Sequence, residues 1–423
     1  MTGMNDANKR FAVIGSGVSG LMAAHELSRS ARVTLYERDV RLGGHAHTHT
    51  VDLGFDDPVQ VDSGFIVHND RTYPVLCGLF EELGVATRDA EMSMSIRDDA
   101  RGVEFAGGKG IRGLLPTPRH LIDAGHLRLL AEVPRFHRRA RAHLHGGTAD
   151  LPLGAFVLRE DFSERLVEGF LRPLVAAVWS CPPDDVDAYP ARHLFRFLDN
   201  HGMLTVGRSL QWRTVVGGSA RYVEKVAAGV ADVRTGTGVR SLARTDRGVR
   251  IVDDAGTAEE FDGAVVAVHP HQALALLDGP TALERELLGA IRYTPNPALL
   301  HTDTSLLPRT ENARGSWNYL ATGDGRPVSV TYDLTRLMGL PRGRETALVT
   351  LGGADLVDPA RVLAELPYEH PSFTTDSVAA ARRLDEISGP GLAFAGAYHG
   401  WGFHEDGAAS GLRAARRLVG EAP

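Results

Sequence analysis

The feature that most constrains this fold is a glycine motif at residues 15–20, Gly-Ser-Gly-Val-Ser-Gly, near the start of the chain. The apolar run at 11–14 before it is typical of a buried parallel strand, and a helical pattern follows it. A second strand is expected at 32–36, ending at Glu37. This order of strand, glycine turn, helix and strand predicts a βαβ unit that binds a dinucleotide, and therefore an α/β fold.

The residue types in the motif suit this role. Gly15 permits the tight turn, Gly17 lets the backbone approach a pyrophosphate, and Gly20 lets the helix pack closely on the strand. The remaining motif residues are Ser16, Val18 and Ser19, at the helix N-terminus whose free N–H groups face phosphates. Glu37 follows Gly15 by 22 residues, where a carboxylate can accept hydrogen bonds from ribose. Its charge disfavours a 2′-phosphate, which leaves FAD and NAD as candidates.

Composition excludes several classes of protein. The chain has 423 residues, enough for two or three domains, with 43% hydrophobic and 23% charged residues. A net charge of -7 argues against a nucleic-acid binder, and two cysteines (Cys77 and Cys181) argue against a disulfide scaffold. No apolar run is long enough to span a membrane, and the polar N-terminus lacks the apolar core of a signal peptide. The expected location is the cytoplasm, with peripheral contact at the inner face of the membrane left open.

Further motifs identify a resemblance. Residues 41–45 (Arg-Leu-Gly-Gly-His) and 61–65 (Val-Asp-Ser-Gly-Phe) resemble the next FAD segments of the flavin amine oxidase and phytoene desaturase clan. The whole chain is similar to a bacterial subfamily of predicted NAD/FAD-binding oxidoreductases in that clan. The resemblance implies FAD contacts by the following residues: Arg38, Gly43, Gly44, His45, Gly64 and Phe65. It also implies that the backbone of Val233 contacts the adenine.

The end of the chain resembles the C-terminal flavin segment of the same clan. A short strand at 392–395 is followed by a glycine-rich loop and a helix whose N-terminus would stabilise negative charge on the reduced flavin. The implied cofactor-binding residues are Gly396, Ala397, Phe403, His404 and Glu405. The clan often places an acid where Ala397 stands, so either Glu405 and backbone groups are expected to replace it, or that bond is absent. Neither cysteine lies just before this motif, so the FAD is expected to be non-covalent.

The expected fold is α/β, a Rossmann-like FAD-binding domain of discontinuous pieces joined to an α+β substrate domain. The FAD-binding pieces are 8–70, 211–270 and 389–423, and the substrate domain comprises 71–210 and 271–388. Residues 71–210 are expected to be mostly helical, with breaks at prolines that include Pro134. Strands are expected at 298–302, 328–332 and 347–351.

The chemistry follows from the flavin, which accepts a hydride at N5. Monoamine oxidase-like relatives often place a lysine near N5, but the matching stretch 297–303 has none, and Lys109 and Lys225 lie elsewhere. Phe403 is expected as a substrate wall, and the other catalytic candidates are Tyr398, His399, Trp401 and His404. The favoured function is dehydrogenation or isomerisation of a lipophilic substrate such as a fatty acyl chain. An amine oxidase and a non-catalytic flavin-binding partner protein are the alternatives.

Two patterns outside these motifs have competing interpretations. His45, His47 and His49 alternate as on one face of a strand, but no other ligand completes a metal site, so none is expected. Residues 111–145 are rich in arginine with interleaved apolar residues, and only two are acidic, Asp123 and Glu132. This pattern is typical either of a helix on an anionic membrane surface or of a solvated helix face.

Overall fold

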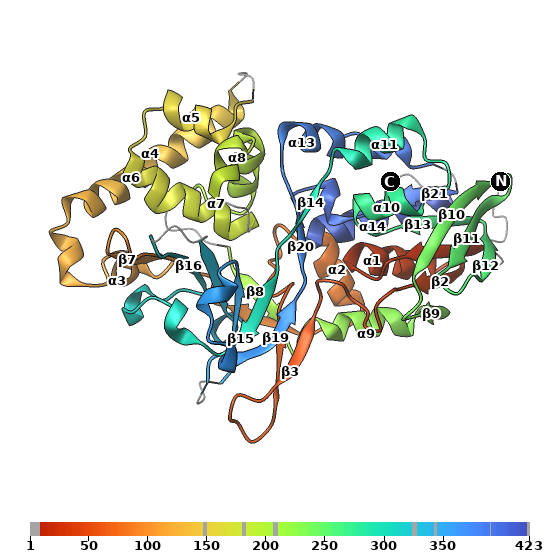
Figure 1. Cartoon of the computed structure of the whole chain (residues 1–423), viewed down its shortest axis with the longest axis horizontal. Coiled ribbons are helices and arrows are strands. Elements are labelled where there is room, and N and C mark those ends of the chain that lie inside the picture. Colours follow the sequence, from red (N-terminus) through yellow and green to blue (C-terminus); the bar gives the residue numbers. More distant parts are fainter. Residues whose placement is uncertain are drawn as a thin grey trace.

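The structure is a computed structural model that describes residues 9–146, 150–179, 183–205, 210–323, 328–341, 345–389 and 391–420. Figure 1 shows two parts beside each other, one containing both ends of the chain and the other a second sheet with a group of helices. Cys181 lies outside the described residues. Among the helices that the structure describes, none is both long and apolar enough to cross a membrane.

A five-stranded sheet forms the centre of the first part. Its strands, in the order β21 (Leu392–Phe394), β13 (Gly263–Val266), β1 (Arg10–Ile14), β2 (Arg32–Tyr36) and β9 (Asp232–Arg234), are all parallel. They come from the three separate segments that were predicted to build the FAD-binding domain. Strand β1 is buried on both faces, with Phe11 and Val13 in one core and Ala12 and Ile14 in the other. This explains why it is a continuous apolar run.

Helices cover one face of the sheet. The core on this face includes residues of α1 (Val18–Leu27), α2 (Pro74–Glu82), α9 (Ala220–Ala228) and α14 (His404–Val419). The first and last helices pack closely because Gly411 has no side chain: a Cβ there would lie 2.1 Å from the carbonyl oxygen of Ser19. The helices near the two ends of the chain therefore lie side by side on the same face of the sheet.

The opposite face carries an antiparallel sheet and three helices. The strands are β10 (Val239–Thr245), β11 (Gly248–Asp253) and β12 (Ala258–Phe261), and the helices are α10 (Pro270–Leu276), α11 (Ala282–Gly289) and α13 (Thr375–Ala381). The sequence placed residues 271–388 in the substrate domain. In the structure, residues of α10, α11 and α13 share a buried core with β1 and β13. The FAD-binding part is therefore larger than its motifs indicate.

A seven-stranded mixed sheet forms the second part. Its order is β19 (Val362–Leu366), β15 (Ala298–His301), β18 (Leu348–Leu351), β17 (Ser329–Asp333), β16 (Trp317–Ala321), β6 (Met94–Asp98) and β7 (Val103–Gly107). Only the β16–β6 pair within it is parallel. The three strands expected at 298–302, 328–332 and 347–351 are confirmed within one residue at most ends. Two short antiparallel pairs connect the parts: β5 (Thr87–Ala90) with β8 (Trp212–Val215), and β14 (Tyr293–Pro295) with β20 (Glu369–Pro371).

Helices pack above this sheet (Figure 1). They are α4 (Ala124–His145), α5 (Leu153–Arg159), α6 (Glu164–Leu166), α7 (Arg172–Trp179) and α8 (Ala191–Asn200), preceded by α3 (Gly110–Leu114) and the 3₁₀ helix η2 (Pro118–Leu121). They enclose a core of aromatic and aliphatic residues that includes Phe136, Phe156 and Phe195.

The expectation that residues 71–210 are mostly helical is confirmed, with β5, β6 and β7 interrupting the helices; the alternation of serine and apolar residues at 93–96 marks β6. The break expected at Pro134 was wrong, since α4 continues through this proline. Proline removes one N–H donor and crowds the preceding turn, but the ends of α4 are determined elsewhere. The Asp123 carboxylate accepts hydrogen bonds from the N–H groups of Gly125 and His126, which starts the helix.

Candidate active site

One large cavity, of about 1890 Å³, runs between the two parts of the molecule. One end is lined by the glycine motif and Glu37, the middle by residues 44–67 and 396–404, and the other end by β6, α4, α7 and β16. The cavity therefore joins the predicted FAD site to the interior of the helical region. Such a connection is required if a bound cofactor is to meet a substrate held in the helical region.

The dinucleotide end has the expected backbone. Gly15 has a φ of +97°, and Gly17 caps α1 with open space where a Cβ would project. A Cβ at Gly20 would lie 1.8 Å from the carbonyl oxygen of Gly15, so only glycine fits between helix and turn. Gly15, Ser16, Gly17, Val18 and Ser19 line the cavity, as do Arg38 and Gly44, whereas Gly20 and Gly43, which were also predicted to contact FAD, do not line it.

Glu37 lies at the wall of this end with its carboxylate already oriented. One oxygen accepts a hydrogen bond from the N–H of Ser16 (2.9 Å) and from its hydroxyl, and the other accepts from the N–H of Asp39 (2.9 Å). These bonds hold the acid beside the glycine turn, where the sequence placed a ribose acceptor. Val233, in contrast, is not among the residues that line the cavity; Thr237, Gly238 and Val239 line it instead. The adenine contact predicted for Val233 is therefore not supported by its position.

His45 closes the middle of the cavity. Its ring stacks on Tyr368, with 4.6 Å between the centroids, and its Nε2 is buried without a hydrogen-bond partner. Burial, together with nearby cationic groups, holds the pKa of His45 well below its ordinary value, so the ring is neutral. A buried, unpaired ring nitrogen at a cavity wall fits a polar atom of a bound cofactor. Gly64 and Phe65 line the same stretch.

The C-terminal motif contributes the facing wall. Gly396, Ala397, Tyr398, Trp401, Phe403 and His404 line the cavity. The ring of His404 stacks on that of Phe65, and its Nε2 lies 2.9 Å from the hydroxyl oxygen of Tyr222. Burial lowers the pKa of His404 to about 3, so this histidine is a neutral hydrogen-bonding group. A proton relay that carries charge at neutral pH does not fit it.

Two residues of this motif do not reach the cavity. The carboxylate of Glu405 accepts hydrogen bonds from the N–H groups of Val75 (2.9 Å) and Leu76 (3.0 Å), so it caps α2 and cannot replace the acid missing at Ala397. His399 lines a small separate hollow between β21 and α14. The expectation that Glu405 binds the cofactor, and that His399 is catalytic, is therefore not supported by their positions.

The far branch of the cavity is mostly apolar, and its polar lining residues are Ser93, His137, His201 and Thr205. The aliphatic and sulfur-containing side chains that line it are Met92, Met94, Ile96, Leu114, Leu130, Val133, Leu174, Val178, Met203, Leu210 and Leu351, and the aromatic ones are Tyr73, Phe105, Phe170, Phe197, Trp212, Trp317 and Tyr332. The described residues that line this branch lie between residues 73 and 351. None of them is an aspartate, glutamate, lysine or arginine. The charged lining residues are at the dinucleotide end and on the 365–369 segment.

The lysines and Cys77 are not among the residues that line this cavity. All three lysines belong to the described part of the chain, and none of them lines it. The amine of Lys109 donates to the carbonyl of Arg314 (2.8 Å), and that of Lys225 donates to the carbonyl of Leu83 (2.7 Å). Cys77, on α2, does not line the cavity, and burial raises the pKa of its thiol to about 11.

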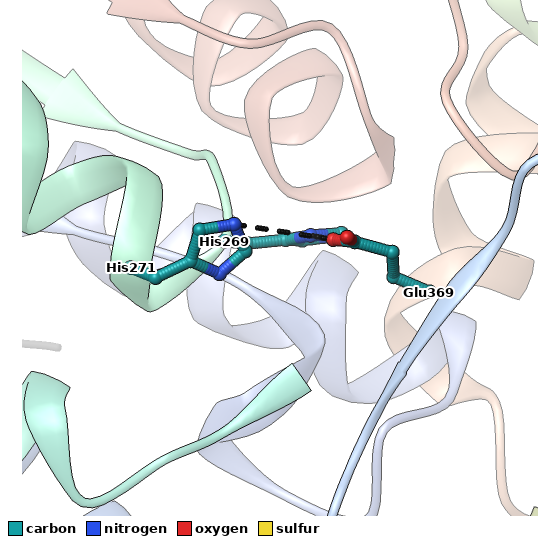
Figure 2. A group of neighbouring side chains, drawn as sticks. All are labelled: His269, His271 and Glu369. Carbon is teal, nitrogen blue, oxygen red and sulfur yellow. Dashed lines mark hydrogen bonds and ion pairs between the residues drawn. The ribbon is translucent and has the colours of Figure 1, made fainter. Parts of the chain in front are cut away.

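Figure 2 shows a cluster beside the cavity that was not predicted: His269, His271 and Glu369. Their ligand-type atoms all lie within 4.8 Å of one another. His269 Nδ1 lies 3.0 Å from an oxygen of Glu369, and His271 Nε2 lies 4.0 Å from the same oxygen. In the structure Glu369 is thus hydrogen-bonded to His269, and the ring of His269 stacks on Tyr293.

The sequence also missed contributors that tertiary contacts supply. Tyr368 and His370 lie outside the predicted cofactor motifs, yet both line the cavity. The Tyr368 hydroxyl lies 2.7 Å from that of Ser63. His201 and Trp212 stack against each other at the apolar branch, with 6.0 Å between centroids. A dense run of aromatic and ionisable residues, Tyr-Glu-His-Pro at 368–371, was the available signal.

The family model for flavin-containing amine oxidoreductases matches residues 18–326, which is most of the chain. The chain belongs to this family. It is a flavin-dependent oxidoreductase, as the arrangement of its dinucleotide motifs indicates. By sequence it is 29% identical over 343 residues to AofH of Mycobacterium tuberculosis, a flavin-containing monoamine oxidase by name, covering 76% of this chain and 70% of AofH. Protoporphyrinogen oxidase 2 of Arabidopsis thaliana is 26% identical over 228 residues, covering 51% of this chain and 41% of its own.

Several solved structures have the same fold as this chain. Cyclohexylamine oxidase from Brevibacterium oxydans superposes with a TM-score of 0.70 at 15% identity, covering 98% of this chain and 99% of its own. A fatty acid isomerase from P. acnes that produces CLA superposes with a TM-score of 0.69 at 15% identity, covering 97% and 99%. Amine-oxidising and fatty-acid-isomerising proteins are equally similar in fold, so the substrate has to be inferred from the cavity.

Proposed function

We propose that this enzyme binds FAD without a covalent bond and oxidises or isomerises an apolar substrate, of which a fatty acyl chain is the best fit. The observation that carries this proposal is the far branch of the cavity, which is lined mainly by aliphatic and aromatic side chains, while the acids Glu365 and Glu369 line the same cavity from the 365–369 segment. A protonated amine in this branch would lose its hydration without gaining a carboxylate partner. A hydrocarbon chain would gain roughly 0.8 kcal/mol for each methylene that it buries.

The residues that would hold FAD follow from the geometry above. Gly15, Gly17 and the N-terminus of α1 offer N–H groups to the pyrophosphate, and Glu37 accepts from the ribose. His45 Nε2 is available to a polar edge of the cofactor. Cys77 lies outside the cavity, which supports non-covalent binding. When bound, the flavin supplies the hydride acceptor.

The protein's own part in the reaction is positioning and exclusion of water. Phe403 stacks on Phe197, with 4.9 Å between centroids, and Trp401 packs against the same ring at 5.9 Å. These rings form an aromatic wall where the cofactor end of the cavity meets the apolar branch. His404 is neutral and its ring is held by Phe65 and Tyr222, so it provides a fixed hydrogen-bonding nitrogen without charge.

His201 contributes a second uncharged imidazole to the cavity wall. Its Nδ1 lies 2.9 Å from the carbonyl oxygen of Phe197 and donates to it. Burial lowers the pKa of His201 to about 4, so the ring is neutral at neutral pH. Like His404, it is a hydrogen-bonding group and a weak proton acceptor at this pH.

The test is anaerobic mixing of the FAD-loaded enzyme with two substrate sets, acyl lipids dispersed in detergent and a series of amines, while flavin absorbance is followed. We expect acyl lipids to bleach the flavin, or to be returned with a shifted double bond that mass spectrometry detects. Bleaching by amines alone would overturn the acyl proposal in favour of an amine oxidase. No change with either set would favour a flavin-binding protein without turnover.

A further inference from the structure

An exposed patch of apolar and basic side chains lies at one end of the helical region. Its apolar members are Ile111, Leu121, Ile122 and Leu127, which are 67%, 60%, 84% and 41% exposed. Arg112, Arg119 and Arg128 lie next to them in the chain and are also exposed. We call these seven residues the α3–α4 patch. Four large apolar side chains within 17 residues of chain is an unusual density for a surface in contact with water.

The patch is positively charged. No ion pair of the described residues involves Arg112 or Arg119, and Arg128 has one partner, Glu132, at 4.0 Å. The nearby acids are engaged elsewhere. The Asp123 carboxylate caps α4 and pairs with Arg165 at 3.0 Å, while Glu132 accepts a hydrogen bond from the Ser163 hydroxyl. Exposed arginines beside exposed aliphatic side chains complement a lipid bilayer, because a bilayer presents anionic headgroups at its surface and apolar acyl chains beneath them.

The patch adjoins an opening of the cavity. Gly108, Gly110 and Pro134 are exposed and also line the cavity, so the cavity reaches the surface between α3 and α4. Leu114, Leu130 and Val133 continue the lining inward from the same two helices. His126 Nε2 lies 2.8 Å from the carbonyl oxygen of Leu114, which ties α3 to the start of α4. Figure 1 shows both elements at the left edge of the molecule, away from the FAD-binding part.

We propose that the α3–α4 patch docks on an anionic lipid surface and that an acyl chain enters the cavity through the opening beside it. The docking claim rests on exposure and charge; the entry claim rests in addition on the acyl substrate proposed above. Aliphatic side chains of the patch enter the acyl region while the arginines hold lipid phosphates. The chain then moves from the bilayer into the apolar branch without crossing water. Of the stretch 111–145, which the sequence left open between membrane contact and solvent, the α3–α4 patch is thereby assigned to the membrane.

The experiment is flotation of FAD-loaded protein with vesicles, without turnover. One set of vesicles contains phosphatidylglycerol and phosphatidylethanolamine, and the other contains phosphatidylcholine alone. The patch variants are Ile122→Glu and Arg119→Glu. Their matched controls are Leu158→Glu, at a side chain 82% exposed on α5, and Arg240→Glu, at an exposed arginine on β10. Retention of FAD and an unchanged circular dichroism spectrum show that each variant is folded.

We expect the wild type to float with the anionic vesicles and less with the neutral ones, and to detach as salt is raised. Each patch variant should lower the bound-to-free ratio about tenfold, whereas the controls should not change it. If the wild type binds neither kind of vesicle, the proposal is overturned, and a protein partner becomes the favoured occupant of the patch. Equal losses in patch and control variants overturn the assignment to this surface.

Flavin reduction by acyl lipid in detergent separates this proposal from the function proposed above. The patch variants should match the wild type there, because Ile122 and Arg119 do not line the cavity, and should be slower only with vesicles. Vesicle binding without flavin reduction by acyl lipids would refute the acyl substrate and keep the docking surface. Flavin reduction by acyl lipids without vesicle binding would refute the docking surface and keep the acyl substrate.

Discussion

The imidazole ring of His404 lies parallel to the phenyl ring of Phe65, with 3.9 Å between their centroids and 6° between their planes. The two residues are more than three hundred positions apart, one at the start of the last helix and the other just after β4 (Val59–Asp62). Their stacking brings the 61–65 segment and the C-terminal motif into direct contact at the cavity. Because both motifs come from segments that pack on the same parallel sheet, the cofactor site depends on the sheet closing correctly.

Glu37→Ala should weaken FAD binding by about 1.5–3 kcal/mol, or roughly tenfold to a hundredfold in Kd, because the ribose loses a charged acceptor. Fluorescence titration of the apoprotein with FAD measures this. Glu260→Ala, at an exposed acid of β12, is the matched control and should bind as the wild type does. Equal affinity in Glu37→Ala and the wild type would refute the role of Glu37.

Acid precipitation or heating should release intact FAD into the supernatant and leave a colourless pellet. The physical reason is that Cys77 lies outside the cavity and its thiol pKa is raised to about 11 by burial, which makes it a poor nucleophile. Absorbance of the supernatant and the mass of the intact pelleted protein measure the outcome. A protein mass increased by one FAD would contradict it, and Cys77→Ser and Cys181→Ser would then locate the bond.

Lys109→Met and Lys225→Met should leave the rate of flavin reduction unchanged, since both amines bond to carbonyl oxygens away from the cavity. Stopped-flow measurement of flavin bleaching with the accepted substrate is the assay. A loss of tenfold or more in reduction rate, with FAD affinity retained, would show that a lysine reaches the flavin and would restore the lysine-assisted mechanism.

Val133→Trp should shorten the apolar branch and select against long acyl chains. Val133 lines the branch from α4, so an indole there displaces methylene groups that each contribute about 0.8 kcal/mol. We expect KM to rise for long chains and to change little for short ones. Ala131→Trp, at an exposed position of the same helix outside the cavity, is the control. An equal rise in KM at every chain length would instead indicate general damage to the helix.

Stability should fall as the pH drops from about 7 toward 4. Burial lowers the pKa of His68, His137, His193, His201, His301 and His370 to about 4, and that of His47, His399 and His404 to about 3. The unfolded chain takes up protons on these rings below pH 6.5 while the folded chain does not, and each unit of lowered pKa corresponds to about 1.4 kcal/mol. Asp62 and Asp406, with pKa values raised by burial to about 6 and 7, oppose the trend but are fewer.

Tm measured across this pH range tests the prediction. His301→Gln, at a ring that is fully buried in β15 and distant from the motifs, should make the dependence on pH shallower. His271→Gln, at a ring about half exposed, should leave the slope unchanged. A Tm that stays constant or rises as the pH falls from 6.5 to 5 would contradict the prediction that the buried neutral histidines make the folded state less stable at acidic pH.

Residues 15–20, Glu37 and the glycine pair at 43–44 determined the FAD-binding fold from sequence. These motifs are local: each needs a particular residue in a particular backbone conformation, such as a left-handed φ at Gly15 or close contact at Gly20. Continuous apolar runs at 11–14 and 392–395 likewise identify strands that are buried on both faces. Local sequence was also enough to show that no lysine occupies the stretch 297–303.

Tertiary structure decided which of the candidate residues reach the cavity. Glu405 and His404 are neighbours in sequence, yet one caps α2 and the other faces the cavity, because successive helical residues point about 100° apart. The apolar branch is assembled from β6, α4, α7, α8 and β16, whose side chains meet only when the mixed sheet and the helical region pack together. No single segment carries that pattern. The sequence therefore determined the cofactor, and the packing of distant segments decided the shape and polarity of the space in which the substrate is bound.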